Sequence, residues 1–338
     1  MPRMSRSISR LLIVTTFAGL MFASACFAAE FRVTPQGDDR IRVSIGDELF
    51  TDYVFAGHSK PIMYPIMGPG GVPMTRNYPM KKDVPGEASD HPHHKSLWYN
   101  HGNVNGVDFW LEYGRDGKPA ENAGKIVQEK VIAMRGGETG IIQTQNQWVA
   151  PGPDKKVVLT DVRTLTFRQV PGGRVIDFDI TLNASHGDVT FGETKEGTMG
   201  IRTHPRLRLK GDEKKGVVAT GKAVNSEGIE GKDIWGKPAK WVDYWGEIDG
   251  KTVGVAIFDH PSNPRHPTTW HARDYGLVAA NPFGGHDFDK SLPEKSGDMK
   301  LKNGDSVTFK YRFYFHEGDH AAAKIPQVYK QWAGAGAE

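Results

Sequence analysis

The sequence predicts an all-β protein, a large antiparallel β-sandwich that ends in a short C-terminal helix. Polar and apolar residues alternate in short runs, which is the period of a strand and not of a helix. Turn sequences such as QGDD at 36–39 and KNGD at 302–305 separate these runs and supply the positive backbone angles of tight hairpins. The 40 glycines and 21 prolines in 338 residues suit a turn-rich globule and exclude a bundle of long helices.

The predicted elements follow from this alternation in chain order. The strands cover residues 40–45, 156–167, 173–182, 205–210, 251–258 and 305–315. The helix covers residues 319–334, where Asp319 can cap the first turn and Pro326 breaks or offsets it. Residues 56–124 and 259–299 do not alternate and are predicted to be long loops, whose length is typical of functional loops and whose aromatic content argues against disorder. No linker or repeat interrupts the chain, so a single domain is expected over residues 29–338.

The first 28 residues have the three parts of a secretory signal peptide. Residues 1–10 are basic, residues 11–25 are an apolar run, and small residues lead to a cleavage site near Ala28. The run is too short to span a bilayer comfortably, so an exported protein, periplasmic or secreted, is expected. Lipidation of Cys26 is the alternative, although Ala23 stands where a lipobox usually has Leu. Cleavage after Ala28 removes Cys26, the one cysteine, and leaves no disulfide and no thiol nucleophile.

The charge of the chain gives no indication of a nucleic-acid partner. Lys and Arg number 43 against 40 Asp and Glu, and the excess is accounted for by Arg3, Arg6 and Arg10 in the leader. The mature domain is therefore neutral and carries no basic surplus. Because no apolar run after the leader is long enough to span a bilayer, the expected partner is a small-molecule or oligosaccharide substrate.

Histidines are concentrated in the two long loops and form the first candidate site. His91 and His93 flank a proline, so the chain is extended there and their rings are expected to point the same way. Since neutral imidazole binds Zn, Cu or Fe, these two are candidate metal ligands, although the cofactor is unknown. His94 and His101 are candidate acid–base residues. The alternative is that the histidines bond loop backbone and orient tryptophans.

Residues 191–205 combine acids, a base and cations within one short stretch. Glu193 and Glu196 stand three residues apart, just upstream of Arg202 and His204. Such a mixture permits general acid–base catalysis if burial separates the pKa values. The alternative interpretation is a solvated hairpin with surface ion pairs.

The third candidate segment, residues 259–274, is stiffened by three prolines. Such a loop favours a preorganised site, because its polar groups need little ordering on binding; the alternative is a buried polar plug. Tryptophans beside Asn, Asp, Arg and His are typical of sugar sites, and Asp243 shares a strand face with Trp241 and Trp245. Across the candidate segments, the expected substrate-binding residues are Trp98, Asn100, Arg202, His204, Asp259, His260, Arg265, Trp270, Arg273 and Asn281.

These motifs resemble the PmoA-like domain family of exported bacterial proteins. The segments concerned are 90–106 (DHPHHxSLWxxHGxVNG), 196–202 (EGxxGIR), 259–276 and 280–284, within a match over about residues 31–332. The resemblance implies a large, twisted, supersandwich-like β-sandwich and the label methane oxygenase PmoA. That label conflicts with the absence of membrane spans, and a copper oxygenase built on an N-terminal histidine needs His where Ala29 or Glu30 stands.

Three functions remain open at this point. The first is a carbohydrate-active lyase, epimerase or hydrolase in which His94, His101 or His271 is the acid or base and Glu193 or Glu196 is its partner. In this hypothesis Arg202 and Arg273 hold a carboxylate or a developing oxyanion. The second is a noncatalytic glycan-binding module, and the third is a metal-dependent oxidoreductase. The density of histidines favours the first and third.

Overall fold

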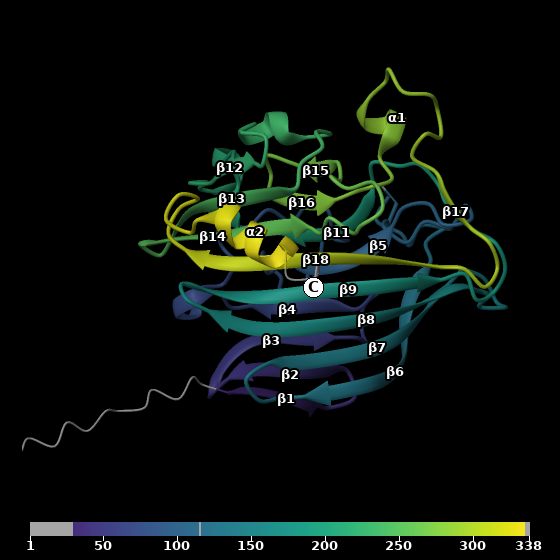
Figure 1. Ribbon diagram of the computed structural model, residues 1–338, viewed down its shortest axis with the longest axis horizontal. Coiled ribbons are helices and arrows are strands. Elements are labelled where there is room, and N and C mark those ends of the chain that lie inside the picture. Colours follow the sequence, from purple (N-terminus) through teal and green to yellow (C-terminus); the bar gives the residue numbers. More distant parts are fainter. Residues whose placement is uncertain (1–29, 115, 335–338) are drawn as a thin grey trace, which may run out of the picture.

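Two large antiparallel sheets pack face to face in the computed structural model, which describes residues 30–114 and 116–334 (Figure 1). The all-β sandwich prediction is confirmed. The predicted signal peptide, with Cys26 and its cleavage site, lies outside the described residues and stays a prediction. Within them, no helix is long and apolar enough to cross a membrane.

The first sheet contains, in spatial order, β1 (Phe31–Gln36), β2 (Arg40–Ile45), β3 (Glu48–Val54), β4 (Ile62–Ile66), β5 (Leu97–His101), β11 (Gly197–Arg202), β16 (Leu277–Ala280) and β15 (Trp270–Ala272). The second contains β12 (Lys222–Asn225), β13 (Trp241–Ile248), β14 (Lys251–Asp259), β18 (Ser306–Glu317), β9 (Gly173–Asn183), β8 (Val157–Val170), β7 (Gly140–Val149) and β6 (Lys125–Arg135). A separate two-stranded antiparallel sheet pairs β10 (Val189–Phe191) with β17 (Met299–Leu301). Helix α1 spans Gly285–Phe288.

The main apolar core lies between the two sheets. Strand β7 shows its origin, because buried and half-buried residues alternate along its whole length. Tyr99 of the first sheet meets Phe178 of the second, with ring centroids 6.3 Å apart. Both sheets contribute to one continuous cluster of buried side chains, which makes the sandwich a single packed body.

A second, smaller apolar layer covers the outer face of the first sheet. Trp98, Leu277 and Ala279 point away from the main core and pack with Trp110. Strands β5 and β16 are therefore buried on both faces. The functional site lies on this outer layer.

The prediction of two long loops at 56–124 and 259–299 was wrong in part. Both stretches contain strands of the first sheet, β4 and β5 in one and β15 and β16 in the other. Strands buried on both faces have no polar side to alternate with, so period-2 patterning does not detect them. The strand predicted at 205–210 was also wrong, since Pro205–Leu207 form a short 3-10 turn.

The C-terminal helix is confirmed, with a later start than predicted. Helix α2 spans Ile325–Gly334, and Pro326 lies in its first turn, where no backbone N–H is needed. Asp319 instead accepts the backbone N–H of Ala322 at 2.9 Å in the turn that precedes the helix. Figure 1 shows α2 on the outer side of the second sheet, where Tyr329 and Ile325 bury against β14 and β18.

Candidate active site

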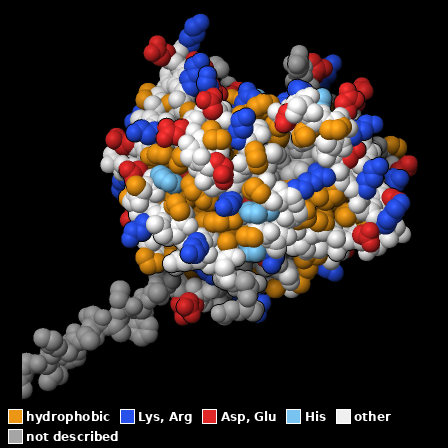
Figure 2. Space-filling model, turned by 45° about the horizontal axis from the view of Figure 1, so that its top comes forward, with side chains coloured by type: hydrophobic (Ala, Val, Ile, Leu, Met, Phe, Trp, Pro, Cys, Tyr) orange, Lys and Arg blue, Asp and Glu red, His pale blue; other side chains and the backbone are white. Residues whose placement is uncertain are grey.

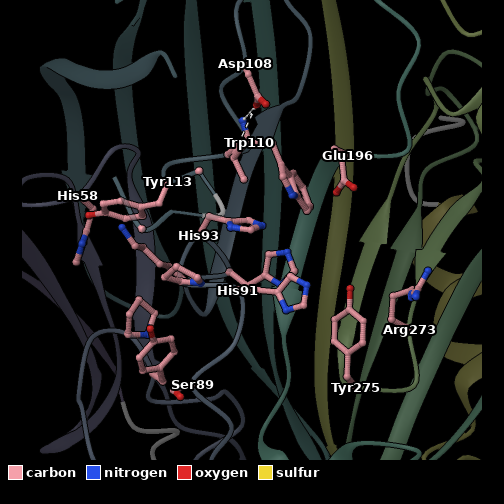
Figure 3. A pocket seen from close by; sticks show the side chains of 18 of the residues that line it. His58, Ser89, His91, His93, Asp108, Trp110, Tyr113, Glu196, Arg273 and Tyr275 are labelled. Carbon is pink, nitrogen blue, oxygen red and sulfur yellow. Dashed lines mark hydrogen bonds between the residues drawn. The ribbon is translucent and has the colours of Figure 1, made fainter. Parts of the chain in front are cut away.

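A cavity of about 1210 Å³ opens on the outer face of the first sheet (Figure 3). Strand order explains its construction, because β5, β11, β16 and β15 are neighbours in that sheet. The loops around these strands therefore meet, although they are far apart in sequence. The main lining residues are His91, His93, His94, Lys95, Asp108, Trp110, Lys195, Glu196, His271, Arg273 and Tyr275.

The position of His271 follows from the strand period. Trp270 and Ala272 point into the main core, so the side chain between them points to the opposite face and into the cavity. Its strand, β15, is paired to β16 with His271 opposite Ala279. The imidazole thus sits on a rigid strand and not on a mobile loop.

The loop that carries the three cavity histidines is held by the buried side chain of Arg76. This guanidinium donates to four backbone carbonyls, those of Ala88 (3.2 Å), Asp90 (2.8 Å), His91 (3.0 Å) and His94 (3.2 Å). It also pairs with the Asp90 carboxylate at 2.5 Å. One buried cation therefore determines the path of the whole histidine loop.

Backbone strain marks both ends of the same loop. His91 has φ 46° and Ser96 has φ 57°, in the left-handed region that L-residues avoid. Such a conformation costs roughly 1–2 kcal/mol for a non-glycine residue. It persists because surrounding contacts over-determine it, and strain of this kind is common at functional sites.

Four parallel rings run from the cavity down into the outer apolar layer. Tyr275, His91, His94 and Trp98 form a bent column of near-parallel rings with successive centroid distances of 5.0, 4.8 and 5.5 Å, and the bend at His91 leaves Tyr275 6.4 Å from His94. Trp110 meets the column edge-on, 5.5 Å from His94. The column fixes the orientation of both imidazoles and gives the cavity an aromatic wall.

His94 and His271 are fixed in opposite tautomers. Arg202 donates to Nδ1 of His94 at 3.1 Å, so the proton of that neutral ring is on Nε2. The Nδ1–H of His271 donates to the carbonyl of Lys195 at 2.7 Å, which leaves the Nε2 lone pair free. His94 can therefore donate a hydrogen bond, whereas His271 can accept a proton.

Burial keeps both imidazoles neutral. It lowers the pKa of His271 to about 4, and the nearby charges of Arg273 and Lys195 add to the effect. Burial also lowers the pKa of His94 well below its usual value, together with charges that include Arg202. At neutral pH, His271 is consequently an unprotonated base.

Glu196 lies across the cavity from His91 and His93, as Figure 3 shows. Burial raises the pKa of this carboxyl above its usual value, and the charge of Asp108 adds to the rise, although Lys195 opposes it. The side chain is 38% exposed, and its nearest cation is Lys195 Nζ at 3.8 Å. A carboxyl with a raised pKa in the same cavity as a neutral imidazole can act with it as a general acid–base pair.

Trp110 and Asp108 complete the wall between these groups. The Trp110 ring stacks near His271 at 6.5 Å, and its buried indole N–H has no acceptor among the described residues. Asp108 accepts the backbone N–H groups of Trp110 and Leu111 at 2.8 and 2.9 Å. An orphaned buried donor is rare in proteins, and here it lies on the cavity wall.

A buried ion cluster supports the opposite wall. Glu112 accepts from Lys60 at 2.7 Å, from Lys95 at 2.5 Å and from Ser59 at 2.5 Å. Burial alone raises the pKa of Glu112, but the two lysines outweigh it and hold the pKa at about 2. The cluster ties the loop after Trp110 to the histidine loop through Lys95.

Residues 40–330 match the profile of DUF6807, a family of unknown function. The chain belongs to the DUF6807 family. The resemblance to the PmoA-like family was therefore wrong, because the matching profile is a different one. The methane oxygenase label and the oxidoreductase hypothesis that drew on it are withdrawn. A search of curated proteins finds no match.

Solved structures similar to this DUF6807 protein are remote. A galactose mutarotase-like protein from Lactobacillus casei matches at 8% identity over 85% of this chain and 100% of its own, with a TM-score of 0.35. The heparan sulfate lyase HepC from Pedobacter heparinus matches at 8% identity over 86% of this chain and 36% of its own, TM-score 0.32. A glycoside hydrolase family 97 enzyme from Pseudoalteromonas sp. strain K8 matches at 10% identity over 84% of this chain and 34% of its own, with a TM-score of 0.30. The chain spans about a third of the lyase and the hydrolase, and scores this low support no functional conclusion.

The structure brings together part of the site predicted for this DUF6807 protein. His91, His93, His94, Glu196, His271 and Arg273 all line the cavity. They come from the three candidate segments, which therefore converge as expected. Asp243 lies elsewhere, buried between His316 and His320 on the second sheet.

Two predicted catalytic residues lie outside the cavity. His101 is fully buried in the main core, where its Nε2 bonds the carbonyl of Gly192 at 2.8 Å and its ring packs on Phe283. Glu193 accepts the backbone N–H groups of His286 and Gly297, both at 2.8 Å, and so anchors the loop after α1. Neither is positioned for catalysis in this cavity.

Three predicted binding residues in and beside β5 and β11 support the cavity from below. Arg202 is 1% exposed and is engaged by His94 and Asp90, so it positions the histidine and does not reach a substrate. Trp98 ends the ring column and donates to Asn100 at 3.0 Å. All three are buried under the site.

The remaining predicted binding residues bond groups of the protein itself; for Asp259, His260, Arg265 and Trp270 this agrees with the polar-plug alternative given for the third segment. Each is satisfied by nearby groups, and none lines the cavity. Asp259 accepts from Asn263, His266 and the backbone of Thr268, and His260 bonds Ser262. Arg265 donates to three backbone carbonyls, and Trp270 donates to the carbonyl of Ala239. Asn281 donates to the carbonyl of Thr194, and His204 caps the turn at Arg206.

The metal-ligand assignment of His91 and His93 gains no support from the geometry. Their rings are 5.8 Å apart and meet edge to face, and His91 Nδ1 lies 3.2 Å from an Asp90 oxygen. Within residues 30–114 and 116–334, no three His, Cys, Asp or Glu side chains are grouped to hold a metal ion. The donors surround a wide cavity and do not converge on a point.

Sequence reasoning missed several residues that build the site. Tyr275 follows Arg273 by two residues on the same motif, and this spacing was its available signal. Arg76 and Lys95 carry no local signal, because their partners are backbone carbonyls and a glutamate distant in sequence. Figure 2 shows that charges of both signs are interspersed with histidine and hydrophobic side chains on the face it presents, in keeping with the neutral composition.

Proposed function

We propose that this DUF6807 protein is a carbohydrate-active enzyme that transfers protons to and from a sugar bound in the cavity. His271 Nε2 acts as the base and the Glu196 carboxyl as the acid. The observation that carries the proposal is the fixed tautomer of His271, in the same cavity as a glutamate whose pKa is raised by burial. An acid and a base that line one cavity suit hydrolysis, elimination or epimerisation.

The walls of the cavity suit a sugar ring. The stacked rings of His91 and Tyr275, which are exposed and half-buried respectively, provide an aromatic surface for C–H groups, and the buried ring of Trp110 supports the wall. Lys195 and Arg273 are donors for hydroxyl groups, and Asp108 is an acceptor, since only one of its carboxylate oxygens is used by backbone N–H groups. Aromatic faces beside a few convergent polar groups are the usual composition of such sites.

The size of the cavity favours more than one sugar ring. Its volume of about 1210 Å³ exceeds the range of roughly 300–1,000 Å³ usual for small-molecule pockets. In Figure 3, His58 and Tyr113 lie at the end of the cavity opposite Glu196 and Arg273. An oligosaccharide can therefore place its reacting unit at Glu196 and a neighbouring unit against Tyr113.

The test is a screen of defined oligosaccharides with the purified protein. Products are followed by mass spectrometry and NMR, which detect hydrolysis, elimination and epimerisation alike. Glu196→Gln and His271→Ala are each expected to lower turnover by about 100-fold or more. Glu247→Gln and His186→Ala, at exposed positions outside the cavity, are the matched controls and keep wild-type turnover.

Two results contradict the proposal. Full turnover by Glu196→Gln and His271→Ala removes both assigned roles. Saturable binding of a glycan without any product, with the two variants changing affinity only, indicates a noncatalytic glycan-binding module instead.

A further inference from the structure

Positive charge in the cavity is not matched by carboxylates. Arg273 has no carboxylate within 4.0 Å among the described residues, and Lys195 has Glu196 only at 3.8 Å. Lys82, an exposed residue that lines the same cavity, also has no ion pair within the described chain. These three cations face two lining carboxylates, Asp108 and Glu196, and in the proposed function Glu196 is the protonated acid. The cavity therefore presents a positive potential.

Arg273 is held in a geometry that leaves its donors available. Its guanidinium lies over the ring of Tyr275, 5.4 Å from the centroid, while its backbone N–H is used by the turn at Leu277. Stacking on an aromatic face leaves the in-plane N–H groups free for a planar anion. Arg202, by contrast, is already bonded to Asp90 and His94.

Resting on the proposed function, we propose that the substrate is an acidic saccharide whose anionic group binds Arg273, with Lys195 as the second cation. The shared chemistry is a carboxylate of a uronic acid or a sulfate ester, both of which match a guanidinium fork. Arg273 is half-buried and lines the same cavity as the proposed base and acid, so an anion bound to it shares the cavity with the reacting part of the substrate.

An anion at this position also activates the base. After burial itself, the charges of Arg273, Lys195 and His91 lower the pKa of His271. A bound anion offsets those charges and raises the pKa of the imidazole toward its usual value. His271 becomes a stronger base only when an acidic substrate is in place, which favours such substrates in turnover as well as in binding.

The experiment compares charged and neutral forms of the same glycan. Trigalacturonic acid and the corresponding glucuronic and mannuronic oligosaccharides are each titrated calorimetrically as free acid and as methyl ester, against wild type and Arg273→Gln. Sulfated and desulfated galactose oligosaccharides form the second arm and distinguish sulfate from carboxylate. Arg135→Gln, exposed on β6, is the matched control, and Lys195→Gln serves as a second variant if Arg273→Gln does not fold.

For at least one pair, the acidic form is expected to bind about 10- to 100-fold more tightly than its neutral form, as one charge-assisted contact provides. Arg273→Gln or Lys195→Gln lowers this ratio, whereas Arg135→Gln keeps it. Equal affinity for both forms, or a ratio unaffected by Arg273→Gln, overturns the inference. Turnover of a neutral glycan that depends on Glu196 and His271, with no preference for acidic forms, overturns it while the proposed function stands. If no glycan in either screen binds or reacts, both proposals fail.

Discussion

The Glu112→Gln substitution tests the ion cluster that supports the cavity wall. Glu112 is 8% exposed and bonds two lysines, of which Lys60 is 1% exposed. The substitution keeps the shape of the side chain but leaves the lysine charges without a counter-ion. Removing one partner of a buried ion pair costs about 3–5 kcal/mol.

The pKa of Glu112 gives an independent magnitude. A fall from the usual 4.5 to about 2 corresponds to about 3 kcal/mol of stability at neutral pH. Because the folded-state pKa is lowered, this contribution is complete above the unfolded-state value and is lost as the pH falls through the folded-state value. It decreases to about 1.4 kcal/mol near pH 3.

The assay is urea unfolding of wild type and Glu112→Gln across this pH range, with Glu121→Gln, exposed in the same loop, as the control. We expect a lower midpoint with an unchanged slope, and a difference between the two proteins that narrows on acidification. A loss below about 1 kcal/mol at pH 7, or a difference that does not change with pH, refutes the reasoning.

Three further predictions concern the site. The pH dependence of kcat/KM is expected to be bell-shaped. Activity rises as His271 loses its proton, through a pKa of about 4, and falls as Glu196, whose pKa is raised, deprotonates. A pH-independent kcat/KM contradicts the assignment of the two residues. Glu193→Gln, at the loop anchor, is expected to reduce kcat/KM far less than Glu196→Gln, and equal losses contradict the separation of the two glutamates. Arg76→Lys keeps the charge, but a lysine at this position cannot reach four carbonyls. Amide hydrogen exchange at residues 88–94 is therefore expected to accelerate while β7 stays protected. Unchanged exchange in that loop contradicts the role of Arg76.

The alternating strands were predictable because one of their faces is less buried than the other. Residues 40–45 coincide with β2, and residues 173–182 fall within β9. Strands β5 and β16 escaped because both of their faces are buried, so their sequences carry no period-2 signal. The sequence pattern therefore identified β8, β9, β14 and β18 of the second sheet and β2 of the first, but not the strands that carry the site.

The candidate site was predicted in its segments but not in all of its residues. Sequence spacing could place His271 and Glu196 in polar stretches, but it could not show that His101 points into the main core. The direction of a side chain depends on strand register, which links Gly197 to His101 across two distant segments. The family resemblance was inferred from a few short motifs, whereas the family profile that matches covers residues 40–330.

The contacts of Arg76 mean that the histidine loop is not a transferable module. Exchanging residues 88–94 alone between relatives would separate the carbonyls from the guanidinium that gathers them. A chimera needs the segment around Arg76 as well, because its backbone N–H bonds the carbonyl of Arg202 in β11. Diversification of this loop is therefore expected to proceed by side-chain replacement on a retained backbone, with length changes confined to the far end of the cavity.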